Sequence, residues 1–261
     1  MPQATQVLLP GSAAEAIELF GNGDDVTVIA GGTIVVPELA DGRRTPGKAL
    51  LLTRAGLTGV SRSGSRVTIG AATPVQELVG FAAPVGPCAA NVADIEIRAQ
   101  GTVGGNLCAT VGEVPRGDLQ SALLAVGATV RSAGAGGVTE APLEDFLGSR
   151  DGRLILDVSY DEPAAGSFVA LERPHAHVYT ALAVSAARAD DGTVRIAATG
   201  MGSHGVRLTS AEKHADDLQK AGDESVADVT PIDDALASAW YRTKTLPVLV
   251  RRALTELKEQ A

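Results

Sequence analysis

Two short segments pair glycines with a threonine, the composition of an anion-binding loop. The first is Ala30-Gly31-Gly32-Thr33, at the end of an apolar, β-branched run that begins at Val26. The second runs from Thr102 to Asn106 and contains Gly104 and Gly105. Adjacent glycines allow backbone conformations in which consecutive N–H groups converge on an anion. Either loop alone could be a simple tight turn, but two such loops facing each other would suit a pyrophosphate held by backbone dipoles without a lysine.

Two polar side chains near the second loop could contribute to the same site. Asn106 carries an amide that can pair with phosphate, ribose or a ring edge. Asp118 follows it by 12 residues, and its carboxylate could accept hydrogen bonds from ribose hydroxyls. Asp is also a favoured N-cap, here for a helix expected over residues 119–126, and both roles can coexist.

The remaining polar residues do not indicate a second catalytic or metal site. There is no G-x-S-x-G sequence and no P-loop, and His175-Ala176-His177 has no evident metal-binding partners. The two cysteines, Cys88 and Cys108, are too few for a four-thiolate zinc site or an iron–sulfur cluster. We expect Cys108, beside Leu107, to be a buried, inert thiol.

Composition excludes several classes of protein. The 261 residues include 22 Lys+Arg and 31 Asp+Glu, a net charge of 22 − 31 = −9, which disfavours nucleic-acid and anionic-membrane partners. Glycine is abundant at 30 residues, against only eight aromatic ones, so backbone contacts should dominate ligand binding. The N-terminus lacks a signal peptide and no apolar run could span a membrane, so we expect a soluble, cytoplasmic protein.

The pattern of elements predicts two α+β units followed by a small antiparallel sheet with C-terminal helices. The first unit reads strand, helix, strand, its helix opening on a Ser12–Glu15 capping box, and a second capping box starts at Thr73. Later strands are expected at 154–158, 168–171 and 193–197. An acidic stretch over 212–234 should be exposed. Thr230-Pro231 should open one helix, and an apolar stripe marks another, formed by Leu246, Val250, Ala253, Leu254 and Leu257.

With these residues in place, the chain resembles the FAD-binding medium subunit of molybdenum hydroxylases, which include carbon monoxide dehydrogenase, xanthine dehydrogenase and aldehyde oxidase. The resemblance covers nearly the whole chain. Its most specific part is the motif G-T-[IV]-G-G-N-[LI], intact from Gly101 to Leu107, and it extends to the A-G-G-T motif, the segment that starts at Asp118, Pro142–Phe146 and the C-terminal Tyr241–Leu254 region.

The resemblance implies an α+β fold that begins with a FAD-binding unit (PCMH / vanillyl-alcohol-oxidase-like) of two subdomains, 1–57 and 58–160. It also implies a C-terminal domain of the carbon monoxide dehydrogenase flavoprotein type over 161–261, with a small antiparallel sheet and a C-terminal helix bundle. It implies FAD in this chain, with [2Fe–2S] clusters on a small subunit and molybdopterin on a large subunit, in a dimer of heterotrimers. No catalytic acid or base and no metal ligand is implied. The FAD-binding residues would be Ala30, Gly31, Gly32, Thr33, Ile34, Val35, Thr102, Gly104, Gly105, Asn106, Asp118, Ile155 and Tyr179.

Three residues depart from the family pattern. Ile34 stands where many members have a polar residue, Glu172 where a lysine is common, and Val178 where an acidic residue usually precedes Tyr179. Two alternatives stay open: a stand-alone flavoprotein oxidoreductase of the related fold, and a scaffold subunit that has lost FAD.

Overall fold

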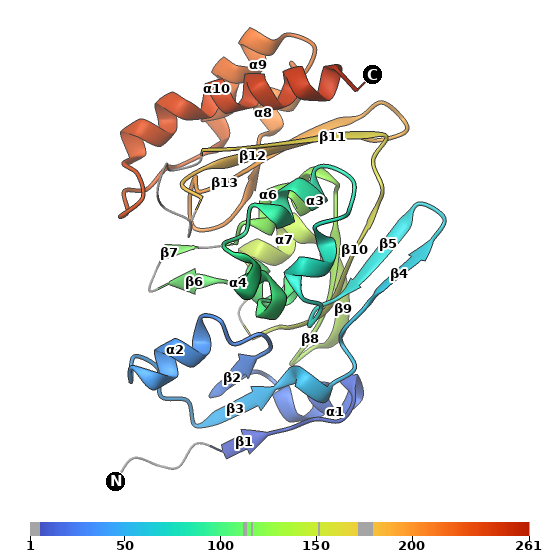
Figure 1. Cartoon of the computed structure of the whole chain (residues 1–261), viewed down its shortest axis with the longest axis vertical. Helices are drawn as coiled ribbons and strands as arrows, with labels where there is room; N and C mark the ends of the chain where they lie inside the picture. Colours follow the sequence, from blue (N-terminus) through green and yellow to red (C-terminus); the bar gives the residue numbers. More distant parts are fainter. Residues whose placement is uncertain (1–5, 112–113, 116, 151, 172–179, 261) are drawn as a thin grey trace.

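The computed structural model describes residues 6–111, 114–115, 117–150, 152–171 and 180–260. The three larger β-sheets follow one another along the longest axis of the molecule (Figure 1). The N-terminal sheet lies at one end, a larger mixed unit lies in the middle, and the C-terminal sheet with its covering helices lies at the other end. The architecture is α+β, as expected from the sequence, while the domain boundaries at 57/58 and 160/161 stay a prediction.

The N-terminal unit is a parallel three-stranded sheet of order β1-β3-β2. The hydroxyl of Ser12 accepts a hydrogen bond from the N–H of Glu15, as the predicted capping box requires, but the Glu15 carboxylate accepts from Gly11 instead of Ser12. The elements are β1 (Gln6–Leu8), α1 (Ala13–Phe20), β2 (Val26–Ile29), α2 (Val35–Ala40), β3 (Lys48–Leu51) and the 3-10 turn η1 (Leu52–Arg54).

The middle unit is an antiparallel sheet of order β4-β5-β10-β8-β9 with helices packed on one apolar core. Its strands are β4 (Val60–Ser63), β5 (Arg66–Gly70), β8 (Thr129–Gly134), β9 (Gly137–Pro142) and β10 (Leu154–Asp161). Its helices are η2 (Val75–Leu78), α3 (Val85–Ala90), α4 (Ile95–Gln100), α5 (Val103–Leu107), α6 (Leu119–Ala125) and α7 (Leu143–Gly148), and the short strands β6 (Thr110–Val111) and β7 (Val114–Pro115) pair separately.

Strand β10 joins the two units because it is buried on both faces. Leu154 and Leu156 pack into the core of the N-terminal unit, whereas Ile155 between them packs into the core of the middle unit. The pairing of β10 with β8 shifts register between Ile155 and Asp157. Such a bulge re-aims side chains, here at the junction between the two units.

The C-terminal sheet is antiparallel, of order β11-β12-β13-β14, as predicted for this part of the chain. The strand expected at 154–158 is not part of it, because these residues form β10 of the middle unit. Helix α6 packs against it on the side of the middle unit and α10 (Ala239–Lys258) covers the opposite side (Figure 1). All five residues of the predicted apolar stripe on α10 are buried. The other elements are β11 (Ala165–Ala170), β12 (Ala183–Arg188), β13 (Val194–Thr199), β14 (Val206–Arg207), α8 (Thr209–Glu212), α9 (Leu218–Glu224) and η3 (Ser225–Asp228).

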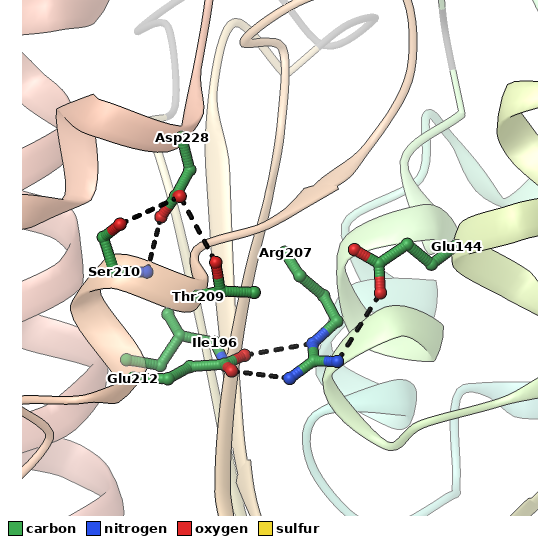
Figure 2. A network of polar contacts seen from close by, with 7 residues as sticks. All are labelled: Glu144, Ile196, Arg207, Thr209, Ser210, Glu212 and Asp228. Carbon is green, nitrogen blue, oxygen red and sulfur yellow. Dashed lines mark hydrogen bonds and ion pairs between the residues drawn. The ribbon is translucent and has the colours of Figure 1, made fainter.

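A polar network attaches the C-terminal sheet to the middle unit (Figure 2). Arg207 on β14 donates to both carboxylate oxygens of Glu212, at 3.1 and 2.5 Å, and reaches Glu144 of α7 at 3.5 Å. Burial alone would lower the pKa of Arg207, but its bonds to Glu212 and the charges of Glu212 and Glu144 raise it. Glu212 also accepts from the N–H of Ile196, so one carboxylate connects β13, β14 and α8.

Three local expectations are wrong. Thr230-Pro231 opens no helix, and α10 begins at Ala239 with Ser238 as its N-cap. The Thr73 hydroxyl does not cap a helix, because it exchanges hydrogen bonds with the backbone of Gly59. The acidic stretch 212–234 is not simply exposed, since it forms α9 and η3 and buries Ala221, Gly222 and Ser225.

Across the described part of the chain, no helix has both the length and the apolar character that crossing a bilayer requires.

Candidate functional site

A cleft of about 550 Å³ lies between the N-terminal and middle units. Its lining joins residues that are far apart in the sequence: the end of β2, the start of α2, helix α5 and the start of β10. Eleven of the 13 residues implicated by the family resemblance line it: Ala30, Gly31, Gly32, Thr33, Ile34, Val35, Gly104, Gly105, Asn106, Asp118 and Ile155.

The first glycine segment is an open loop between β2 and α2. Gly32 has φ +73°, a conformation that favours glycine, and its carbonyl accepts the N–H of Val36 at the start of α2. Within the described chain, the N–H groups from Gly31 to Ile34 donate to no protein acceptor. Because backbone donors are rarely left without partners, this row of four amides is suited to an anionic ligand.

The second glycine segment is not an open loop, because it forms the N-cap and most of the short helix α5. The N–H groups of Val103 and Gly104 donate to the carbonyls of Thr73 and Ala71 at 2.9 and 2.8 Å. The Gly105 amide donates to the Thr102 hydroxyl at 3.2 Å, and Asn106 donates to the Thr102 carbonyl. The expectation of two equivalent cradles of amide donors is therefore wrong, because this segment uses its N–H groups within the protein.

Close packing explains most of these glycines. A Cβ on Gly31 would lie 2.0 Å from the carbonyl oxygen of Gln100, so the two glycine segments touch directly. A Cβ on Gly104 would lie 2.9 Å from that of Ala71, where α5 packs against the residue that follows β5. Gly105 is exposed and would meet only the Thr102 hydroxyl, so it presents bare backbone to the cleft.

The capping role expected of Asp118 belongs to Asn106. The side-chain oxygen of Asn106 accepts the N–H of Leu119 at 2.9 Å, so Asn106 and not Asp118 caps α6. The amide nitrogen of Asn106 donates to none of the described residues and is left for a ligand. Asp118 makes no side-chain capping bond to α6, and its partly exposed side chain lines the cleft.

Two of the expected site residues, Ile155 and Thr102, differ in where they lie relative to the cleft. Ile155 is 5% exposed and forms part of an apolar wall of the cleft. Thr102 does not line the cleft, because its hydroxyl caps α5. Tyr179 lies outside the described residues, as do Glu172 and Val178.

Sequence reasoning missed three arginines in the cleft and misplaced one cysteine. Arg44, Arg150 and Arg153 all line the cleft, although they belong to no motif that would single them out. Cys108, expected to be buried, is exposed and also lines it. Cys88 is the buried cysteine, and burial raises the pKa of its thiol, with a further contribution from the charge of Asp118.

The cleft suits a large ligand with both a phosphate and an apolar part. It combines three arginines, and amides that have no acceptor among the described residues, with aliphatic walls from Ile29, Ile97 and Ile155. Among the described residues, no group of His, Cys, Asp or Glu could hold a metal ion.

Comparison with known proteins identifies the ligand class. Residues 3–159 match the family described as the FAD binding domain in molybdopterin dehydrogenase. The whole chain is 27% identical to the 6-hydroxypseudooxynicotine dehydrogenase complex subunit alpha of Paenarthrobacter nicotinovorans, covering 96% of it. Over 97% of its length, it is 28% identical to the carbon monoxide dehydrogenase medium chain of Afipia carboxidovorans, again covering 96% of that relative.

Solved structures agree over the full length. The chain superposes on a chain of the reconstituted CO dehydrogenase from Oligotropha carboxidovorans with a TM-score of 0.87 at 25% identity, covering 100% of both chains. A chain of quinoline 2-oxidoreductase from Pseudomonas putida 86 shares the fold, with a TM-score of 0.83 at 20% identity, over 98% of this chain and 97% of the other. This chain therefore belongs to the family of FAD-binding medium subunits of molybdenum hydroxylases, and its cofactor is FAD.

Proposed function

We propose that this chain is the electron-transfer subunit of a heteromeric molybdenum-dependent dehydrogenase of the xanthine dehydrogenase type. It accepts electrons from [2Fe–2S] clusters of a partner and passes them to a terminal acceptor. The observation that carries the proposal is the row of amides from Gly31 to Ile34, which have no acceptor among the described residues and lie in a cleft that the second glycine motif also lines.

The residues of the cleft divide the binding of FAD between them. Backbone amides of the first loop hold the diphosphate, and Gly105 allows close approach from the opposite wall. Asn106 and Asp118 offer an amide nitrogen and a carboxylate to the sugar or ribityl hydroxyls. Ile155 packs against the apolar part of the cofactor, and Tyr179 is carried over from the family as a residue beside the flavin.

Bound FAD would supply the redox chemistry. The role of this chain is to bind the cofactor, exclude water from it and orient it. We therefore assign no residue as a catalytic acid or base. The relatives are named as dehydrogenases of different substrates. Accordingly, we place substrate oxidation on another subunit, which carries molybdopterin.

We infer the partners from the same family. A small iron–sulfur subunit and a large molybdenum subunit would join this chain in a dimer of heterotrimers in the cytoplasm. The acidic surface, with a net charge of −9, disfavours nucleic acid as a partner. The terminal acceptor would be NAD⁺, oxygen, a quinone or another electron carrier.

Affinity purification of this chain from its native cells tests the proposal. We expect two further subunits in the native mass spectrum, together with FAD, iron and molybdenum in the purified material. A chain that carries FAD but recovers neither iron nor molybdenum would indicate a stand-alone flavoprotein. A chain with partners and no flavin would indicate a scaffold.

A further inference from the structure

The cleft is positively charged although the protein is acidic overall. Its charged lining residues in the described chain are three arginines and one aspartate, Asp118, against a net charge of −9 for the whole sequence. A local excess of positive charge inside a cleft favours an anionic ligand. The three arginines differ in what they already bind.

Two of them are engaged within the protein. Arg44 pairs with the carboxylate of the buried Glu38 at 2.8 Å, which neutralises its charge. Arg153 donates from Nε to the hydroxyl of Ser132 at 3.0 Å and from Nη2 to the Ser132 carbonyl at 2.8 Å, and it also bonds Thr139. These bonds fasten Arg153 to β8 and β9, so its guanidinium has a structural task.

Arg150 differs from both. Its side chain is partly buried, and its one hydrogen bond within the described chain runs from Nη1 to the carbonyl of Leu107 at 3.4 Å. It forms no ion pair with any carboxylate that the structure describes. A partly buried charge without a counter-charge loses hydration and gains little in return, so an anion in the cleft would stabilise it.

Arg150 can supply N–H donors on the wall of the cleft that α5 forms, where the backbone amides already donate within the protein. Leu107 is the last residue of α5, the helix that contains the second glycine motif. The amides of this motif from Val103 to Asn106 are used inside the protein. The first loop thus offers unpartnered amides, whereas the wall formed by α5 offers the guanidinium of Arg150.

We propose that Arg150 is an anion-binding residue of the cleft and pairs with the diphosphate of FAD. The inference rests on the proposed function. Guanidinium groups pair with phosphate oxygens by charge-assisted hydrogen bonds, and Arg150 has N–H donors to spare. The charge is thus supplied by a residue outside both glycine motifs.

Titration of the flavin-free full-length chain with FAD and with riboflavin, followed by flavin fluorescence, tests the proposal. Arg150→Gln should raise the Kd for FAD about ten-fold or more, the range of one hydrogen bond to a charged group. Binding of riboflavin, which has no phosphate, should not change. The salt dependence of FAD binding should become shallower in this variant, and Arg150→Lys should recover part of the affinity.

Arg54→Gln is the matched control, because Arg54 is exposed, does not line the cleft and changes the net charge by the same amount. It should bind FAD like the wild type. If Arg150→Gln binds FAD as tightly as the wild type and with the same salt dependence, or if it weakens FAD and riboflavin equally, the proposal is wrong. A wild-type chain that binds no FAD would overturn the proposed function itself.

Discussion

Gly31 is the residue at which the two glycine segments touch. A Cβ there would lie 2.0 Å from the Gln100 carbonyl oxygen and 2.9 Å from the Cα of Gly101. Both of these atoms belong to the backbone, so no side-chain rotation relieves the contact. The shape of the cleft therefore depends on the absence of a Cβ at position 31.

Gly31→Ala should separate the two segments and disturb the row of amides next to it. We expect the variant to lose about 1–3 kcal/mol of unfolding free energy, as overpacked sites do, and to bind FAD more weakly. Urea unfolding and FAD titration measure the two effects. Gly136→Ala is the control, because a Cβ on Gly136 meets nothing within 4 Å; equal behaviour of the two variants would show that the contact does not shape the cleft.

Cys108 provides a reporter inside the cleft. It is exposed, whereas Cys88 is fully buried and its thiol pKa is raised by burial. The thiolate is the reactive form, so a thiol reagent at pH 8 should label Cys108 quickly and Cys88 only on unfolding.

Saturating FAD should slow the labelling of Cys108 at least several-fold, because the cofactor would cover the wall on which it lies. The rate can be followed by absorbance or by mass spectrometry of the intact chain, with Cys108→Ser as the control that removes the fast phase. Equal labelling rates with and without bound FAD would place the cofactor elsewhere.

The sequence predicts those residues of the site that lie within short contiguous motifs. Gly31 and Asn106 belong to short motifs, and both line the cleft. Arg150 is brought there from a loop 43 residues beyond Leu107, and no local pattern marks it. Asp118 was expected to cap α6 from its position alone, yet Asn106 does so from 13 residues away.

The start of α10 depends on a buried ion pair. Arg242 donates to Asp234 at 2.7 Å, and their side chains are 2% and 3% exposed. Burial by itself would raise the pKa of Asp234, but hydrogen bonds from Arg242 and from the amides of Ala237 and Leu236 lower it. The pair thus holds the segment before α10 onto the helix.

Arg242→Met should cost about 3–5 kcal/mol of unfolding free energy near neutral pH, because it removes the guanidinium that pairs with the buried Asp234 carboxylate. The pKa of Asp234 is lower in the folded protein than in the unfolded chain, where it is about 4. Its ionised carboxylate therefore stabilises the fold above about pH 4, and this contribution is lost as the pH falls through the folded pKa. The difference between wild type and variant should therefore shrink in acid.

Urea unfolding at several pH values measures this difference. The double variant Arg242→Met with Asp234→Asn should recover a large part of the loss, since it leaves no uncompensated charge. A single variant as stable as the wild type, or a difference that grows in acid, would contradict the assignment.

Among the elements, the helical spacing of apolar residues predicts α10, whereas the alanine-rich sequence of β12 does not indicate a strand. The stripe from Leu246 to Leu257 has helical spacing and is buried. Strand β12 reads Ala-Val-Ser-Ala-Ala-Arg and is almost continuously buried in the middle of its sheet. Alanine has a weak strand propensity, so only the pairing with β11 and β13 determines its conformation.

At the scale of the molecule, the cleft exists because two units share a boundary. Leu50 of β3 and Leu156 of β10 belong to one apolar cluster, and Gly31 packs directly on Gln100. The C-terminal sheet contributes no residue to the lining of the cleft that the structure describes. The hydrogen bond from Arg207 to Glu144 instead attaches this sheet to the middle unit (Figure 2).

A ligand that bridges the two units should stabilise them together. FAD at 100 times its Kd should add about 2.7 kcal/mol to the unfolding free energy, by mass action on the folded state. A single unfolding transition that shifts upward with FAD would show that the ligand acts on the joined units.

The FAD stoichiometry of the full-length chain tests most directly whether this cleft is the cofactor site. Flavin-free protein should take up one FAD per chain in an absorbance titration, and Gly31→Ala should take up less under the same conditions. A chain that binds no FAD, or a Gly31→Ala variant that binds it fully and with unchanged affinity, would contradict the assignment of this cleft as the cofactor site.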